Sequence, residues 1–110
     1  MTDRDQTPQD LELIAAGDGN GLLKIRGPLD FTSVPRIAGD IPALIAGRKH
    51  LTLDLSGVTT ANSAGLALLL ELKRLGMIGG CSMQFQHLPK ALANIIRISE
   101  LSELFASNGN

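Results

Sequence analysis

Residues 51–75 constrain the fold of this chain more than any other segment. They begin with Leu-Thr-Leu-Asp-Leu at 51–55, an alternation of apolar and polar residues that predicts a central strand. A short polar loop follows, and leucine and alanine then dominate a helix predicted from Ser63 to about Leu75. A strand followed closely by an apolar helix is typical of an α/β domain, so Ser63 is expected where a helix begins beside a sheet.

A glycine-rich stretch, residues 17–21, separates two apolar runs near the start of the chain. The runs are residues 11–15 and 22–26, and this pattern is typical of a β-hairpin. Gly27 and Pro28 are expected to end the second strand of the hairpin.

Helices and strands are predicted to alternate along the rest of the chain. Apolar residues at spacings of three and four predict a helix within residues 30–47, which Pro42 kinks or shortens. Gly76 and the pair Gly79 and Gly80 are expected to stop the helix that starts at Ser63. The remaining predicted elements are a strand at residues 81–86, a helix from Pro89 to about Ile98 and a short element at residues 101–105.

Together these elements predict one α/β domain with a mixed sheet, begun by the N-terminal hairpin and covered by helices. The chain has 110 residues, which is enough for a single core. We expect the domain to span residues 11–106, between flexible ends at 1–10 and 107–110.

Composition excludes several classes of function. The net charge is −1, and the only aromatic residues are three Phe, so a nucleic-acid partner is not expected. Residues 1–10 are polar and contain no apolar segment of a signal peptide, which predicts a cytoplasmic location. The longest apolar stretch, residues 64–70, is too short to insert into a membrane.

No catalytic or metal site is predicted. A nucleophilic Ser63 would need a base, and no pattern places His50 or His87 beside it. With Cys81 as the single cysteine and no clustered histidines, the chain has no metal-ligand spacing, and no motif calls for a cofactor. We therefore expect a protein that is not an enzyme.

The start of the predicted helix is a candidate switch or docking loop. A helix start has four free N–H donors and about half a positive charge, so Ser63 is suited to cap it, and a phosphate would be favoured there. Thr59, Thr60 and Asn62 add hydrogen-bonding groups. The alternative is that Ser63 is only a structural cap.

A helical wheel separates two faces of this helix. Leu66 and Leu70 fall beside Ser63 and Arg74, on the face opposite to the predicted core. If this pair is exposed, it forms an apolar patch for a partner protein. The alternative is that another helix of the domain covers the pair. The predicted partner-binding residues are Thr59, Thr60, Asn62, Ser63, Leu66, Ala67, Leu70 and Arg74.

Four segments resemble the STAS family, the domain of anti-sigma factor antagonists and sulfate transporter tails. They are Gly-Pro-Leu-Asp at 27–30, Leu-Asp-Leu-Ser-Gly-Val at 53–58, Asn-Ser-Ala-Gly-Leu at 62–66, and the strand at 81–86. The resemblance covers roughly residues 11–105. It implies a mixed sheet with helices mainly on one side, no catalytic activity, and function through regulated binding to another protein.

Two members of this family suggest different partners. In anti-sigma factor antagonists, the residue matching Ser63 is phosphorylated by a partner kinase, and the preceding residue is commonly Asp, where this chain has Asn62. This departure removes a carboxylate from the loop. An anti-sigma factor antagonist that is switched by phosphorylation of Ser63 is therefore the alternative function.

Residues 63–72, Ser-Ala-Gly-Leu-Ala-Leu-Leu-Leu-Glu-Leu, most resemble the MlaB-like branch of small STAS subunits. These subunits bind the ATPase of the lipid-asymmetry ABC transporter, which moves phospholipid between the inner and outer membranes. The resemblance implies a cytoplasmic accessory subunit that is held at the inner membrane by its ATPase partner.

Overall fold

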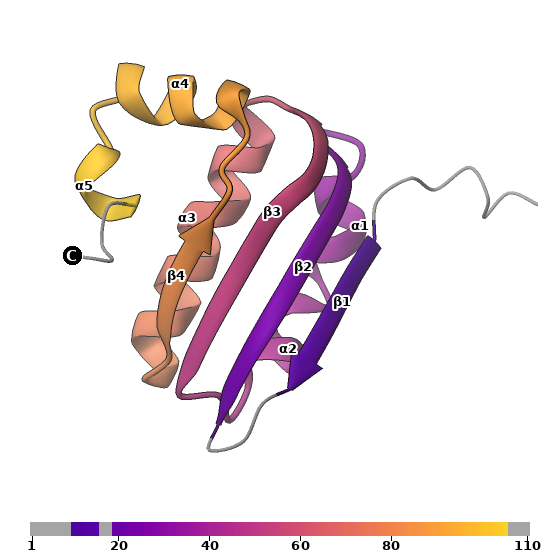
Figure 1. Cartoon of the computed structure of the whole chain (residues 1–110), viewed down its shortest axis with the longest axis vertical. Helices are drawn as coiled ribbons and strands as arrows, with labels where there is room; N and C mark the ends of the chain where they lie inside the picture. Colours follow the sequence, from indigo (N-terminus) through magenta and orange to yellow (C-terminus); the bar gives the residue numbers. More distant parts are fainter. Residues whose placement is uncertain (1–9, 16–18, 106–110) are drawn as a thin grey trace, which may run out of the picture.

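Four strands form one sheet in the computed structural model, which describes residues 10–15 and 19–105. β1 pairs with β2 in antiparallel fashion, whereas the pairs β2 with β3 and β3 with β4 are parallel. The sheet is therefore mixed and begins with the predicted hairpin, which confirms the expected fold class. In spatial order, the strands are β1 (Asp10–Ala15), β2 (Asn20–Leu29), β3 (His50–Ala61) and β4 (Ser82–Gln86) (Figure 1).

Five helices accompany the sheet in the described part of the chain. Figure 1 shows α1, α2 and α3 behind the sheet on one face, with α4 and α5 at the end and flank near β4, while the other face is uncovered. The predicted helix that follows Pro89 is confirmed as α4. The helices are α1 (Val34–Ala38), α2 (Ile41–Ile45), α3 (Ser63–Gly79), α4 (Lys90–Ile98) and α5 (Ser102–Phe105).

The core lies between the sheet and the helices behind it. Alternate residues of β2 and β3 are buried, because successive side chains of a strand point to opposite faces and only one face is covered. The fully buried side chains at the centre of this core are Leu23, Ile25, Leu29, Ile41, Leu51, Leu53, Leu55, Leu69, Leu72 and Leu92.

Both central strands run further than the sequence predicts. β2 continues through Gly27 and Pro28, and its last residue, Leu29, lies opposite Ala61 of β3. β3 therefore includes residues 56–61, which we expected to form a polar loop. Pairing between the two strands holds both extensions, and the β-branched residues within 58–60 suit an extended backbone.

The helix predicted within residues 30–47 is divided into two. α1 ends at Ala38, and Pro42 is the second residue of α2. The first turn of a helix does not use the backbone N–H that proline lacks, so Pro42 helps to start a new helix instead of kinking a continuous one.

The long helix α3 passes through Gly76, which was expected to stop it, and ends at Gly79. Gly80 then caps it in a left-handed conformation, with φ of 75°. Gly76 is needed for packing, since a Cβ there would lie 2.8 Å from the carbonyl oxygen of Cys81. Only the Gly79 and Gly80 part of the predicted stop is confirmed.

The expected flexible ends lie almost wholly outside the described residues. Residues 1–9 and 107–110 are not described, and Asp10 is the first residue of β1. The tip of the hairpin, residues 16–18, is also outside the described part. Among the helices that are described, none is long and apolar enough to cross a lipid bilayer.

Candidate functional site

Ser63 begins α3 at the end of the sheet where the carboxyl ends of β2 and β3 lie. The backbone N–H of Asn62 donates to the carbonyl of Leu29, the last residue of β2, at 3.1 Å. The loop after β2 and the start of α3 therefore leave the sheet next to each other, near the top of Figure 1. The exposed side chains here, which we call the Ser63 surface, are Phe31, Thr59, Thr60, Ser63 and Ala67.

Asn62, and not Ser63, caps α3. The side-chain oxygen of Asn62 accepts a hydrogen bond from the N–H of Ala64 at 2.8 Å, and its carbonyl accepts the N–H of Gly65 at 2.9 Å. The N–H of Asn62 is also bonded, so three of the four donors at this helix start are occupied. The expectation of four free donors and of a Ser63 cap was wrong, because Asn62 takes the capping position.

The Ser63 hydroxyl is exposed and makes no hydrogen bond to any described residue. Its own N–H is the one donor at the helix start that stays without a partner within the described chain. His50 lies at the opposite end of β3, and His87 contacts Asp54 on the open face of the sheet. The geometry suits a group that a partner contacts or modifies, and it places neither histidine as a base for Ser63.

An irregularity in β3 turns two threonines outward next to Ser63. β3 has four residues, 58–61, opposite three residues of β2, 27–29. The extra residue breaks the alternation of the strand, and Thr59 and Thr60 are both exposed. β-Bulges re-aim side chains in this way at the rims of sheets and beside functional sites. The two threonines were predicted in a loop but lie on the bulged end of a strand.

Hydrogen bonds fix the loop after β2 and present Phe31 to solvent. The Asp30 carboxylate accepts the N–H groups of Thr32 and Ser33 at 3.0 and 2.9 Å, and these backbone bonds lower the pKa of Asp30. The buried Ser33 hydroxyl donates to the carbonyl of Pro28 at 2.6 Å. Phe31 is 69% exposed. Sequence reasoning missed Phe31, although it is an aromatic residue that directly follows the Gly-Pro-Leu-Asp segment at 27–30.

Leu66 does not form the exposed patch that the helical wheel predicts. It is only 8% exposed and belongs to the core, while Leu70 is half-buried against that core. Lys73, seven residues after Leu66, shares its side of α3. The Lys73 ammonium lies 5.6 and 5.9 Å from the ring centroids of Phe85 and Phe105, so the C-terminal part of the domain covers this side. For Leu66, the alternative of cover within the domain is therefore correct.

Beyond Ser63, the exposed side of α3 carries one small side chain and then charged side chains. Ala67 is exposed, one turn after Ser63. Arg74 is also exposed, but its guanidinium donates to the Glu71 carboxylate at 2.9 and 2.6 Å. This contact lowers the pKa of Glu71 and raises that of Arg74. Arg74 therefore already has an anionic partner within its own helix.

On the open face of the sheet, Asp54 holds the segment after β4. Its carboxylate accepts the N–H of Ser56 at 2.9 Å and lies 3.0 Å from Nδ1 of His87. The bond from Ser56, supported by His87, lowers the pKa of Asp54 to about 2. Within residues 10–15 and 19–105, no three His, Cys, Asp or Glu side chains gather to hold a metal ion.

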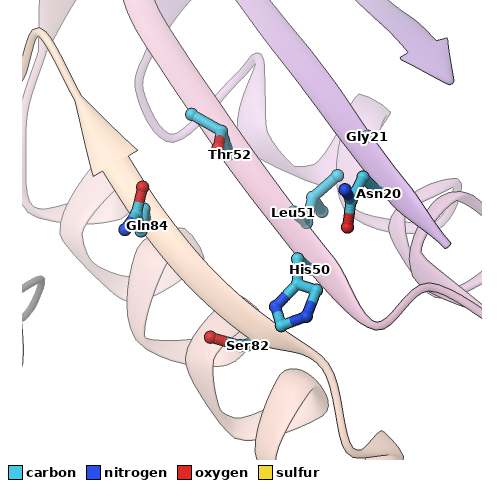
Figure 2. A pocket seen from close by; sticks show the side chains of 7 residues that line it. All are labelled: Asn20, Gly21, His50, Leu51, Thr52, Ser82 and Gln84. Atoms are coloured by element: carbon cyan, nitrogen blue, oxygen red, sulfur yellow. The ribbon is translucent and has the colours of Figure 1, made fainter. Parts of the chain in front are cut away.

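A hollow of about 340 Å³ lies on the open face, at the end of the sheet opposite to Ser63. Figure 2 shows that His50 and Ser82, from neighbouring strands, extend over the same part of this face. Ligand sites are usually concave and mostly apolar, whereas this hollow is shallow and polar. No predicted site residue lies in it. Its lining residues are Asn20, Gly21, His50, Leu51, Thr52, Ser82 and Gln84.

The fold and the Ser63 surface define a small α/β domain with an exposed serine at the start of its longest helix. A family model described as "Mlab, STAS domain" matches residues 13–106. The chain therefore belongs to the STAS domain family.

Solved structures of other STAS-like proteins share this fold. An anti-sigma factor antagonist from Mycobacterium paratuberculosis has a TM-score of 0.70 and 24% identity, over 89% of this chain and 83% of that one. A sulfate transporter family protein from Wolinella succinogenes gives 0.69 and 17%, over 86% and 78%. The phosphorylated form of the Bacillus cell fate determinant SpoIIAA gives 0.67 and 16%, over 84% and 86%. These likenesses concern the fold.

Proposed function

We propose that this chain is a non-catalytic accessory subunit that binds the cytoplasmic ATPase of a phospholipid ABC transporter. In this role it supports the assembly and activity of a complex that maintains outer-membrane lipid asymmetry. The observation that carries the proposal is the match of residues 13–106 to a family model whose description names Mlab. The chain would act in the cytoplasm, peripheral to the inner membrane through its partner.

We assign the contact to the Ser63 surface and the adjoining exposed side of α3. Ser63, Thr59 and Thr60 supply hydroxyl groups, and Phe31 supplies an apolar anchor of the kind enriched at interface centres. The small side chain of Ala67 leaves room for a partner to approach the helix backbone. The exposed parts of Leu70 and Arg74 extend this surface, while Asn62 and Leu66 support it from within the domain.

The test is a change that alters this surface without touching the core. Ala67→Arg places a large cation at an exposed helical position, so the fold should persist while the ATPase interface is obstructed. We expect affinity for the purified ATPase to fall at least about tenfold, which corresponds to about 1.4 kcal/mol. The measurement is isothermal titration of each variant with the ATPase, after circular dichroism has confirmed its fold.

Ala43→Arg is the matched control, because it makes the same substitution at an exposed position of α2. It should bind the ATPase like the unchanged protein. A folded Ala67→Arg protein with unchanged affinity would contradict the proposed surface, and failure of the unchanged protein to bind would contradict the proposed partner.

The exposure of the Ser63 hydroxyl favours one alternative, an anti-sigma factor antagonist switched by phosphorylation. A phosphate at Ser63 adds close to two negative charges, enough to block or create a partner contact. Against this reading, Asn62 stands where antagonists commonly have Asp. Incubation with a cognate anti-sigma factor kinase and ATP, followed by intact mass measurement, separates the two functions. Only the antagonist requires one phosphate per chain, lost in Ser63→Ala.

A further inference from the structure

The end of the molecule opposite to Ser63 carries an apolar groove between α2 and α3. The groove encloses about 160 Å³, and its walls include Pro42, Ile45, Leu75 and Ile78. A cavity of about 150 Å³ is large enough to hold a benzene-sized group. The groove can therefore receive one large apolar side chain.

Two exposed apolar side chains border this end of α3. Met77 is 81% exposed and Ile78 is 70% exposed, and Ile78 also lines the groove. Single exposed apolar residues are common, but an adjacent pair beside a hollow marks a contact surface. This surface is distinct from the Ser63 surface, because α3 runs for about 25 Å between them at 1.5 Å per residue.

Two basic residues follow the groove directly in the chain. Gly47 lines the groove, and Arg48 and Lys49 come next. Cys81 also lines the groove, and burial raises the pKa of its thiol. The charge of Arg48 acts in the opposite direction, because Arg48 lies close to this thiol. Arg48 donates to the carbonyl of Asn20 at 3.2 Å. In the described chain, neither basic residue forms an ion pair.

Among the described residues, the charge beside the groove is therefore positive. The carboxyl end of α3 contributes about half a negative charge, which is less than the two full positive charges of Arg48 and Lys49. Glu71 of α3 is already paired with Arg74, and Asp40 lies at the far end of α2. An occupant that matches this surface needs carboxylates beside an apolar anchor.

We propose that the α2–α3 groove binds an acidic segment of a partner protein, which inserts one apolar side chain between α2 and α3. A carboxylate beside this anchor would meet Arg48, whose charge acts on Cys81 in the groove, and a second would meet Lys49, whose side-chain stem lies next to Gly19. An anionic membrane fits less well, because each basic residue near a lipid surface contributes only about 1 kcal/mol and two cannot hold a protein there. The α2–α3 groove also fits a single side chain better than it fits the flat surface of a membrane.

The test uses the full chain, labelled with nitrogen-15, and the capped peptide Asp-Glu-Leu-Glu-Asp. Titration should shift the backbone amide resonances of Ala46, Gly47 and Gly79, with a Kd on the order of 0.1 to 1 mM. Peptides with Ser in place of Leu, or with Lys in place of the acidic residues, should bind at least about tenfold more weakly. This experiment involves no ATPase, so its result is independent of the proposed function.

Variants of exposed residues test the assignment without disturbing the core. Lys49→Glu and Ile78→Ala should each weaken binding at least about fivefold. Lys90→Glu reverses an exposed charge at the start of α4 and should bind normally. The proposal is overturned by equal binding of the lysine peptide, by shifts confined to another surface, or by no saturable shift up to about 5 mM peptide. Concentration-dependent self-association through the groove, or sedimentation with anionic vesicles that Lys49→Glu abolishes, would also overturn it.

Discussion

At the scale of single residues, Asn62 and Ser63 exchange the roles that the sequence suggested. Asn62 bonds the N–H of Ala64, and the Ser63 hydroxyl bonds nothing in the described chain. Asn62→Ala should therefore lower the free energy of unfolding by about 1 kcal/mol, the usual loss for a removed N-cap. Ser63→Ala should change it by less than about 0.5 kcal/mol. Urea denaturation of both variants measures the difference.

Asn62→Asp serves as the control, since a carboxylate also caps a helix and is favoured by the helix dipole. It should be at least as stable as the unchanged protein. Equal losses in Asn62→Ala and Ser63→Ala would show that the capping assignment is wrong.

The carboxylate of Asp54 makes stability depend on pH. In the folded protein its pKa is about 2, below the ordinary value of 3.8, so the unfolded chain binds a proton first as the pH falls. The stabilisation is complete above about pH 4 and is lost as the pH falls through about 2. Asp54→Asn should therefore be less stable than the unchanged protein at pH 7, and this difference should narrow between about pH 4 and pH 2.

Denaturant unfolding of both proteins across this pH range tests the prediction. Asp40→Asn is the control, because the exposed Asp40 side chain makes no capping hydrogen bond to α2. Its stability should follow that of the unchanged protein at every pH. A difference between Asp54→Asn and the unchanged protein that stays constant from pH 7 to pH 2 would contradict the assigned cause.

At the scale of elements, two glycines of α3 differ in the room they leave for a side chain, so replacing them with Ala should change stability in opposite directions. A Cβ at Gly76 would lie 2.8 Å from the Cys81 carbonyl and 3.0 Å from a Met83 side-chain atom, whereas one at Gly79 would meet nothing within 4 Å. Gly76→Ala should therefore destabilise the protein by about 1 to 3 kcal/mol, the usual cost of overpacking. Gly79→Ala should stabilise it by up to about 1 kcal/mol, through better helix propensity.

Thermal and urea unfolding of the two variants decide this point, because both make the same chemical change in one helix. Stabilisation by Gly76→Ala would mean that α3 does not pack closely against the start of β4. Equal effects of the two changes would also contradict the proposed close approach.

The sequence predicts those elements whose cause is local. The hairpin follows from glycines between apolar runs, and the end of α3 follows from Gly79 and Gly80. The extensions of β2 and β3 depend on pairing between distant residues such as Leu29 and Ala61, which no local pattern reports.

The sequence predicts where the candidate site lies but not which of its side chains are exposed, because their exposure depends on contacts between distant segments. Ser63 lies at the predicted helix start, yet the burial of Leu66 depends on segments that follow much later in the chain. The exposure of Phe31 depends on the hydrogen bonds that Asp30 and Ser33 make with the backbone. A helical wheel treats one helix alone, and it cannot show which of its sides the rest of the domain covers.

At the scale of the whole molecule, the large exposed apolar side chains of the described residues lie in three parts of the fold. Phe31 follows the end of β2 on the Ser63 surface, Met77 and Ile78 lie near the end of α3, where Ile78 lines the α2–α3 groove, and Ile98 and Leu104 lie on α4 and α5. The length of α3 separates the first two places, since this helix runs from the carboxyl ends of β2 and β3 back to the start of β4 (Figure 1). Each place can therefore be tested without disturbing the others.

Phe31→Ala tests whether the proposed ATPase contact lies on the Ser63 surface. Phe31 is 69% exposed, so its removal should change the free energy of unfolding by less than about 0.5 kcal/mol. If Phe31 anchors the partner, affinity for the ATPase should fall at least about fivefold, a loss of roughly 1 kcal/mol. Ile98→Ala removes a side chain that is 73% exposed, at the last residue of α4, and should leave both quantities unchanged. Equal affinities of the two variants would contradict the assigned surface, because ATPase binding would then not distinguish the Ser63 surface from the rest of the molecule.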